Sequence, residues 1–197
     1  MNVSTEFVTS ATGPGGFPKD QLPEIAFVGR SNVGKSSLLN ALVRRSVART
    51  SAAPGKTRLV NFYRVKVNLQ KAFYLVDLPG YGYARGKKNS EAFGDLVEAY
   101  FTRTTVKSVL LLIDARHPGL EADRIAWDWI NQKTVQKIIV ATKADKLTRA
   151  MRVRHTKELE SIYQCPLRLI STQSGEGLEG LWKLIIKLKN LKEIKTR

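Results

Sequence analysis

The chain has 197 residues, 43% of them hydrophobic and 25% charged, so it is long enough to bury a core as one domain. Its 33 lysines and arginines exceed its 17 acidic residues by 16, which favours nucleic acid or an anionic membrane surface as a partner. The single cysteine, Cys165, excludes an internal disulfide. No signal-peptide pattern or membrane-length apolar run is present, and we expect a cytoplasmic monomer without stable membrane association.

The basic residues are unevenly distributed. Between Ile25 and Val76 there is no acidic residue, and this stretch holds ten basic ones: Arg30, Lys35, Arg44, Arg45, Arg49, Lys56, Arg58, Arg64, Lys66 and Lys71. A second basic run covers residues 183–197, with Glu193 as its only acid. Such a face is suited to the phosphates of nucleic acid. A solvated surface with no partner is the alternative.

The first quarter of the chain begins with a weakly patterned segment. Residues 1–23 contain a glycine and proline cluster, so we expect an N-terminal extension of loop with a short extended piece at 6–8. Residues 24–28 are typical of a buried strand, and the apolar pattern that follows predicts a helix to about Val43. Residues 44–57 lack apolar periodicity and predict a mobile loop.

The rest of the chain alternates between strands and helices. Alternating polarity over 59–67 predicts an edge strand, and a short connection joins it to a buried strand at 72–76 as an antiparallel hairpin. The later elements are a helix at 90–101, a strand at 109–113, a helix at 121–131, a strand at 135–141, a helix at 148–161, a strand at 167–170 and a helix at 177–191. We therefore predict an α/β domain over 24–190, with a mostly parallel six-stranded sheet, one antiparallel edge strand and helices on both faces. Residues 191–197 would be a basic C-terminal tail.

One stretch between the first strand and the first helix matches the phosphate-binding loop G-x-x-x-x-G-K-S/T. Its backbone N–H groups and the helix N-terminus favour phosphate binding. The Lys35 side chain would reach the outer phosphates, and the Ser36 hydroxyl would bind Mg²⁺. A glycine-rich turn before an ordinary helix is the alternative. The candidate binding residues here are Gly29, Arg30, Ser31, Asn32, Val33, Gly34, Lys35, Ser36 and Ser37.

Two further segments point to the same phosphates. Asp77-Leu78-Pro79-Gly80 follows a buried strand, 41 residues after Ser36, so Asp77 would hold Mg²⁺ through a water and the Gly80 N–H would face the γ-phosphate. Pro54-Gly55-Lys56-Thr57 lies in the expected mobile loop. Thr57 there can bind Mg²⁺ and the γ-phosphate, and losing both contacts on hydrolysis gives an order-to-disorder switch. The candidate catalytic residues are Lys35, Thr57, Gly80 and Asn32.

Two segments after later strands indicate recognition of guanine. In Thr142-Lys143-Ala144-Asp145, the Asp145 carboxylate can accept hydrogen bonds from the N1–H and 2-amino groups of guanine, which adenine lacks. The Lys143 stem can lie along the base. Ser171-Thr172-Gln173 follows the last strand and can donate backbone N–H groups to guanine O6. An ordinary helix-start turn and a polar turn are the respective alternatives.

The residues of these motifs and their order in the chain resemble those of one protein family. Asn32 in the phosphate loop, Pro54–Thr57, the run from Asp77 to Ala84 and the run from Thr142 to Leu147 are similar to the YihA/EngB (YsxC) branch of bacterial ribosome-assembly GTPases. The resemblance covers about residues 22–190. It implies a Ras-like fold and a GTP/GDP-binding switch that acts in assembly of the large ribosomal subunit and contacts rRNA.

The resemblance also bears on hydrolysis. Many GTPases carry a water-orienting Gln directly after Asp-x-x-Gly, but this chain has Tyr81 there, so we expect weak intrinsic activity. In related GTPases, an Asn matching Asn32 helps to bind K⁺, although a helix cap is the alternative for Asn32. Three rival functions are a membrane-associated signalling GTPase, a phosphate-loop kinase acting on a metabolite, and a structural RNA-binding protein with a vestigial nucleotide site.

Overall fold

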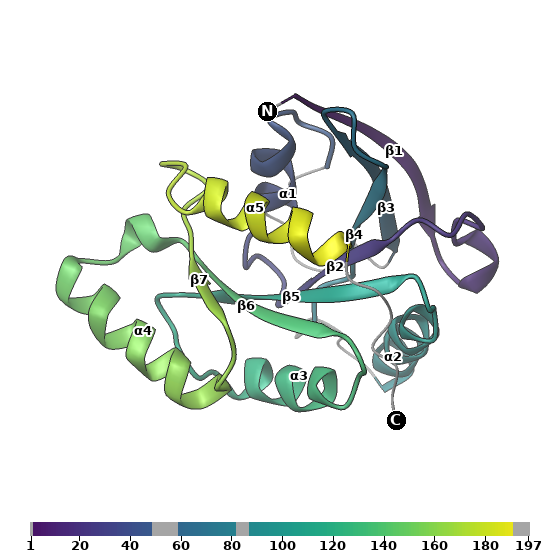
Figure 1. Ribbon diagram of the computed structural model, residues 1–197. Coiled ribbons are helices and arrows are strands. Elements are labelled where there is room, and N and C mark those ends of the chain that lie inside the picture. Colours follow the sequence, from purple (N-terminus) through teal and green to yellow (C-terminus); the bar gives the residue numbers. More distant parts are fainter. Residues whose placement is uncertain (1, 49–58, 82–86, 191–197) are drawn as a thin grey trace.

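The computed structural model describes residues 2–48, 59–81 and 87–190, and within them seven strands form one sheet in the order β1-β3-β4-β2-β5-β6-β7 (Figure 1). The strands are β1 (Val3–Ala11), β2 (Glu24–Gly29), β3 (Val60–Val67), β4 (Phe73–Asp77), β5 (Val106–Asp114), β6 (Gln136–Thr142) and β7 (Leu167–Leu169). Strands β2, β4, β5, β6 and β7 are parallel, and β3 is antiparallel to both of its neighbours. The predicted α/β class and mostly parallel sheet are confirmed.

Helices cover both faces of this sheet, as predicted. One face carries α1 (Lys35–Val43) and α5 (Leu178–Lys189), and the other carries α2 (Lys87–Phe101), α3 (Glu121–Asn131) and α4 (Arg149–Tyr163). The predicted cap of α4 is present, because the Thr148 side chain accepts a hydrogen bond from the Met151 N–H. Two short 3₁₀ helices, Pro14–Gly16 and Ala144–Lys146, complete the described elements.

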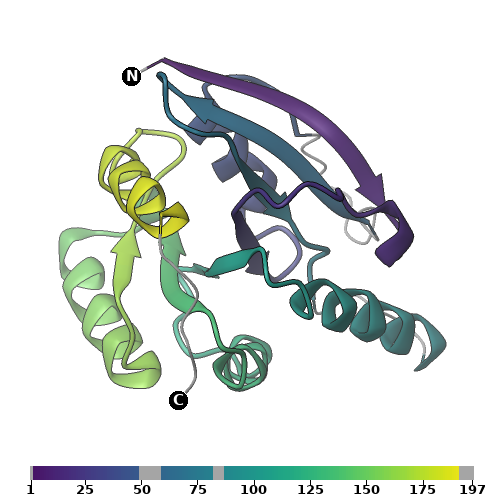
Figure 2. The ribbon, with the colours of Figure 1, turned by 45° about the vertical axis from the view of Figure 1, so that its right-hand side comes forward.

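The predicted number of strands and the predicted edge strand are wrong. Residues 3–11 form a seventh strand, β1, which pairs with β3 from Val3↔Val67 to Ala11↔Val60, so β3 lies inside the sheet and β1 is at the edge (Figure 2). The register shifts between Phe7 and Thr9, and this irregularity breaks the period-two pattern that predicts a strand. An edge position also leaves Phe7 half exposed.

The N-terminal residues are packed onto the domain beyond this pairing. Phe17 is buried between Phe62 and Tyr100, with ring centroids 5.6 Å and 6.2 Å away. Arg103 donates to the Pro18 carbonyl at 2.9 Å and to the buried Glu24 carboxylate at 2.6 Å. These contacts fix the start of β2, the strand whose last residue, Gly29, begins the phosphate-loop motif.

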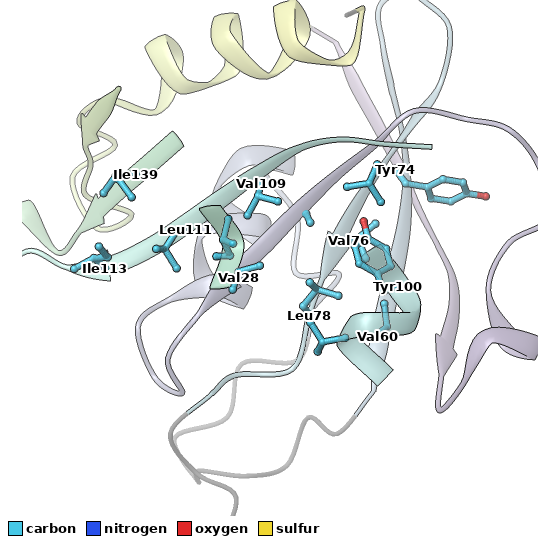
Figure 3. Close-up of a cluster of buried hydrophobic side chains, with 14 of the residues drawn as sticks. Val28, Val60, Tyr74, Val76, Leu78, Tyr100, Val109, Leu111, Ile113 and Ile139 are labelled. Carbon is cyan, nitrogen blue, oxygen red and sulfur yellow. The ribbon is translucent and has the colours of Figure 1, made fainter. Parts of the chain in front are cut away.

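Two hydrophobic clusters hold the layers together. The cluster under α2, α3 and α4 includes Val28, Val76, Tyr100, Leu111 and Ile139, whose side chains meet between the sheet and these helices (Figure 3). The second cluster lies under α1 and α5 and contains the residues Ile25, Phe27, Leu38, Leu42, Leu75, Leu110, Leu181, Trp182 and Ile185. Because both faces are buried, the central strands present loops at their carboxyl ends from a rigid base. No helix in the described part of the chain is long and apolar enough to cross a lipid bilayer.

Candidate functional site

The predicted site segments meet at the carboxyl ends of the parallel strands, on one edge of the sheet. Hydrogen bonds between the segments show their closeness. The Ser31 N–H donates to the Tyr81 carbonyl at 3.2 Å, and the Thr142 hydroxyl donates to the Val33 carbonyl at 2.8 Å. The Ser171 hydroxyl donates to Asp145 Oδ1 at 2.6 Å. Four sequence motifs therefore form one continuous site.

The loop between β2 and α1 has the backbone that its motif predicts. Gly34 caps α1 with a φ of 108°, which side-chain-bearing residues rarely adopt, and Asn32 has a φ of 63°. The cap of α1 is thus Gly34, which has no side-chain cap bond, and the alternative role of Asn32 as the helix cap is wrong. Gly80 approaches this loop so closely that an added Cβ would lie 2.9 Å from both Lys35 Nζ and the Ser31 nitrogen.

Lys35 and Asp77 are buried charged groups within this loop region. Lys35 Nζ donates to the Gly29 carbonyl at 3.0 Å and the Arg30 carbonyl at 3.4 Å, and burial lowers its pKa although attraction to Asp77 opposes the shift. Burial raises the pKa of Asp77, and attraction to Lys35 and a hydrogen bond from Ser36 oppose that shift. The site therefore holds an ammonium group, with little water around it, at the N-terminus of a helix, where anions are favoured.

Ser36 and Asp77 have the chemistry to bind a magnesium ion. The Ser36 hydroxyl lies 3.1 Å from Asp77 Oδ2, while Asp77 Oδ1 is buried without a hydrogen-bond partner among the described residues. A carboxylate with an unused oxygen beside a hydroxyl is a hard-oxygen ligand pair. No group of three or more His, Cys, Asp or Glu side chains in residues 2–48, 59–81 and 87–190 forms a metal cage. Mg²⁺ needs none, because it is commonly bound by one or two carboxylates together with substrate phosphates.

The Tyr81 side chain is hydrogen-bonded to helix α3. Its hydroxyl donates to Asp123 Oδ1 on α3 at 2.7 Å, and burial, with the nearby Asp123 carboxylate, raises the pKa of Tyr81. Asp123 is itself buried, which raises its pKa. The sequence did not reveal this contact, because an acidic residue in the first turn of a helix is ordinary.

The base-recognition segments are held in a defined geometry. Lys143 has a φ of 62°, and its Nζ donates to the Asn32 carbonyl at 3.0 Å, so its stem crosses from β6 to the phosphate loop. The hydrogen bond from the buried Ser171 hydroxyl lowers the pKa of Asp145. The Ser171 oxygen also accepts from the Gln173 and Ser174 N–H groups. Ser171 thereby orients the Asp145 carboxylate, a role that could not be predicted from the sequence.

Asp114 is a second residue that the sequence analysis missed. It ends β5, is buried, and accepts hydrogen bonds from Lys143 Nζ at 2.9 Å and from Arg116 Nε and Nη2 at 2.9 Å and 2.7 Å. Burial alone would raise the pKa of Asp114, but the hydrogen bonds from Arg116 and Lys143 outweigh it and the pKa is lowered. The available signal was an acidic residue at the carboxyl end of a central strand beside the phosphate loop.

Several other candidate residues fall into three groups. Val33, Leu78 and Ala144 bury their side chains, so only their backbone groups are available to a ligand. Thr172 and Gln173 are exposed beside Asp145. The segment Pro54, Gly55, Lys56 and Thr57 lies outside the described residues.

Known proteins are similar to this chain in sequence. A family model described as 50S ribosome-binding GTPase matches residues 24–143. A probable GTP-binding protein EngB from Geobacillus sp. (strain WCH70) is 42% identical over 190 residues, which cover 92% of this chain and 96% of that protein.

Solved structures agree on the fold. A probable GTP-binding protein EngB aligns with a TM-score of 0.66 and 21% identity, over 84% of this chain and 98% of that one. Era in complex with MgGDPNP and a segment of 16S ribosomal RNA aligns with a TM-score of 0.74 and 25% identity over 89% of this chain. The matched region spans only 59% of the Era chain.

Proposed function

The chain belongs to the EngB family of GTP-binding proteins, and we propose that it is a GTP-hydrolysing switch that acts in assembly of the bacterial large ribosomal subunit. The observation that carries this proposal is the convergence of a phosphate loop and an oriented Asp145 carboxylate at one edge of the sheet. A phosphate loop alone would serve many nucleotides. Asp145 adds the acceptor that guanine requires and adenine cannot satisfy.

Each part of the site has a role in this proposal. The backbone from Gly29 to Ser37 would surround the phosphates, with Lys35 supplying positive charge and Gly80 donating its N–H near the γ-phosphate. Ser36 and Asp77, with Thr57 from outside the described residues, would hold Mg²⁺, which neutralises phosphate charge when bound. Asp145 would read the base, Lys143 would pack along it, and the loop from Ser171 to Gln173 would close its far side.

Hydrolysis by the isolated chain is expected to be weak. Tyr81 cannot orient a water as a Gln amide does, and its hydroxyl is engaged by Asp123. Asn32 is exposed in the phosphate loop and has no role as a helix cap, which leaves its side chain available for K⁺ near the phosphates. We therefore include K⁺ as an activating cofactor in the proposal.

The proposed ribosome-binding surface begins at the end of α1. Arg44 and Arg45 are exposed there, and Trp182 Nε1 donates to the Leu42 carbonyl at 2.7 Å, which places this end against α5. Exposed Lys187 on α5 extends the positive charge, and exposed Lys183 lies one turn before it in an ion pair with Glu179 at 2.7 Å. We call Arg44, Arg45, Lys183 and Lys187 the basic face. Its charge suits it to rRNA phosphates, and Arg44 and Arg45 precede in the sequence the segment that contains Thr57, which suits the face to control by the nucleotide.

The membrane alternative has less support. The apolar stripe of α5, formed by Leu181, Ile185 and Leu188, is buried against the sheet and so is not available to lipid. A helix that lies on a bilayer needs an exposed apolar face beside its basic one. We propose a cytoplasmic monomer whose partners are GTP, GDP and the large subunit.

Co-sedimentation with purified 50S subunits tests the proposal. The parent chain should sediment with 50S in a nucleotide-dependent manner, and Arg44→Glu with Arg45→Glu should weaken binding without changing GTP affinity. Each lost phosphate contact should reduce the log–log salt slope by about 0.7–0.9. Arg154→Glu with Lys157→Glu makes the same charge change on α4, across the sheet, and is the matched control.

The outcomes separate the alternatives. Equal loss in both double variants would indicate non-specific charge attraction. Binding to anionic vesicles in preference to 50S would favour the membrane function. A parent chain that binds no guanine nucleotide would contradict the proposal altogether.

A further inference from the structure

Arg152 joins the two loops that surround Asp145. It lies in the first turn of α4. Its Nη2 donates to the Ala144 carbonyl at 2.9 Å, and its Nη1 donates to Glu176 Oε1 at 2.7 Å. Ala144 precedes Asp145 directly, and Glu176 lies in the loop between β7 and α5. One planar guanidinium therefore holds a fixed distance between segments that are far apart in the sequence.

These contacts complete a closed ring of hydrogen bonds. The Glu176 carbonyl accepts from the Ser171 N–H at 3.0 Å, and the Ser171 hydroxyl donates to Asp145 Oδ1 at 2.6 Å. The ring then returns through the backbone from Asp145 to Ala144 and so to Arg152. In such a ring, the position of the Asp145 carboxylate depends on both loops at once. Loss of Arg152 removes its side-chain link between the two loops, and leaves the Ser171 hydroxyl, the Lys146 ammonium 3.5 Å from Asp145 Oδ2, and the Ala144 N–H bond to the Ile170 carbonyl to set that position.

We infer that Arg152 is a positioning residue for purine-base recognition, which holds Asp145 where it receives both guanine donors. The inference rests on the proposed function, since it concerns the same site. Selectivity depends on this placement, because a carboxylate rejects a base lacking one donor only when the carboxylate cannot move to compensate. Inosine nucleotides keep the N1–H and lack the 2-amino group, so they report on Asp145 placement.

Global stability should depend little on Arg152. The side chains of Arg152 and Glu176 are 32% and 42% exposed, and ion pairs at such positions contribute little to folding. A role confined to folding and a role in positioning therefore predict different results. The first lowers the unfolding temperature of the nucleotide-free chain, and the second changes the ratio of affinities for two bases.

The experiment measures dissociation constants for GDP and IDP, the GDP dissociation rate, and thermal unfolding without nucleotide. Arg152→Met removes every hydrogen-bond donor of the guanidinium, and Arg152→Lys keeps a positive charge with a single donor group, the ammonium. Arg154→Met is the control at an exposed position on the same helix. Arg152→Met should raise the Kd for GDP by about tenfold, mainly through faster dissociation, and should reduce the preference for GDP over IDP. Arg152→Lys should recover part of both effects, and Arg154→Met should match the parent.

Each result supports or overturns the inference. An unchanged GDP-to-IDP ratio in Arg152→Met overturns it, even if both affinities fall. A fall in unfolding temperature with the ratio unchanged assigns Arg152 to folding alone. A parent chain that binds neither nucleotide overturns the proposed function as well, and the parent alone reveals this before any variant is compared.

Discussion

Replacing Thr142 by Val tests whether the base segment and the phosphate loop act as one unit. The Thr142 hydroxyl is buried, and it lies 2.8 Å from the Val33 carbonyl and 3.1 Å from the Ile113 carbonyl. It is a buried side-chain link from β6 to the phosphate loop, next to the more exposed link from Lys143 to the Asn32 carbonyl. Valine keeps the β-branched shape and the strand preference, so the substitution removes the donor and little else.

The expected loss follows from the buried acceptor that remains. A hydroxyl has one proton, so mainly one of the two carbonyls loses its donor, and an unsatisfied buried acceptor costs about 1–3 kcal/mol. We expect the free energy of unfolding to fall by about 1–2 kcal/mol and the melting temperature by about 2–8 °C for a chain of this size. The Kd for GDP should rise several-fold, because Val33 belongs to the phosphate loop.

Urea unfolding without nucleotide and calorimetric titration with GDP measure the two effects. Thr104→Val makes the same chemical change at an exposed position before β5 and should stay within about 0.5 kcal/mol of the parent. If Thr142→Val were as stable as that control and bound GDP equally well, the hydroxyl would not couple the two segments.

Four further predictions concern the charged and loop residues. Lys35→Ala should lower GTP affinity by at least about a hundredfold in calorimetry while circular dichroism shows an intact fold, since its charge serves the ligand; normal binding would remove Lys35 from the site. Asp145→Asn should weaken GTP binding and favour xanthosine nucleotides, because an amide can donate to the 2-oxo group, and an unchanged preference for guanine would place base recognition elsewhere. GTP hydrolysis should be faster in K⁺ than in Na⁺, and Asn32→Ala should abolish the difference; equal parent rates in both salts would exclude the K⁺ role. Because the pKa of Asp114 is lowered in the folded state, this carboxylate stabilises the fold at pH values above its ordinary pKa of 3.8. The contribution is lost as the pH falls through the pKa of the folded state. The free energy of unfolding of Asp114→Asn should therefore depend less on pH below about 4 than that of the parent, as measured by urea unfolding.

The site could be located from the sequence because its motifs follow strands. A buried apolar run fixes a strand, and parallel strands bring their carboxyl ends to one edge, so motifs far apart in the chain must meet. Lys35, Asp77 and Asp145 were predicted on this basis, and the structure brings their segments together. Spacing and chemistry sufficed, because each motif depends mainly on backbone conformation next to its own strand.

The missed features depend on contacts that leave no local pattern. Only residues 6–8 of strand β1 were predicted as extended, because its register shift breaks the alternation and its edge position needs few apolar residues. Arg152 has ordinary helical neighbours, and only the fold shows that its guanidinium reaches Ala144 and Glu176. Asp114 could have been suspected from its strand end, but its partner Lys143 could not have been identified without coordinates.

Tyr81 gives a structural reason for the slow GTP hydrolysis that we propose. Its backbone carbonyl accepts a hydrogen bond from Ser31 in the phosphate loop, while its side chain is bonded to Asp123 on α3. Tyr81 therefore contacts both the phosphate loop and helix α3. To place the Tyr81 hydroxyl beside an attacking water, its partly buried hydrogen bond to Asp123 would have to break, and this would leave the Asp123 carboxylate unpaired at that oxygen. We therefore expect water orientation to come from other groups, such as a cation near Asn32 or a residue supplied by the ribosome. In the switch that we propose, the partner would then set how long the GTP-bound state lasts.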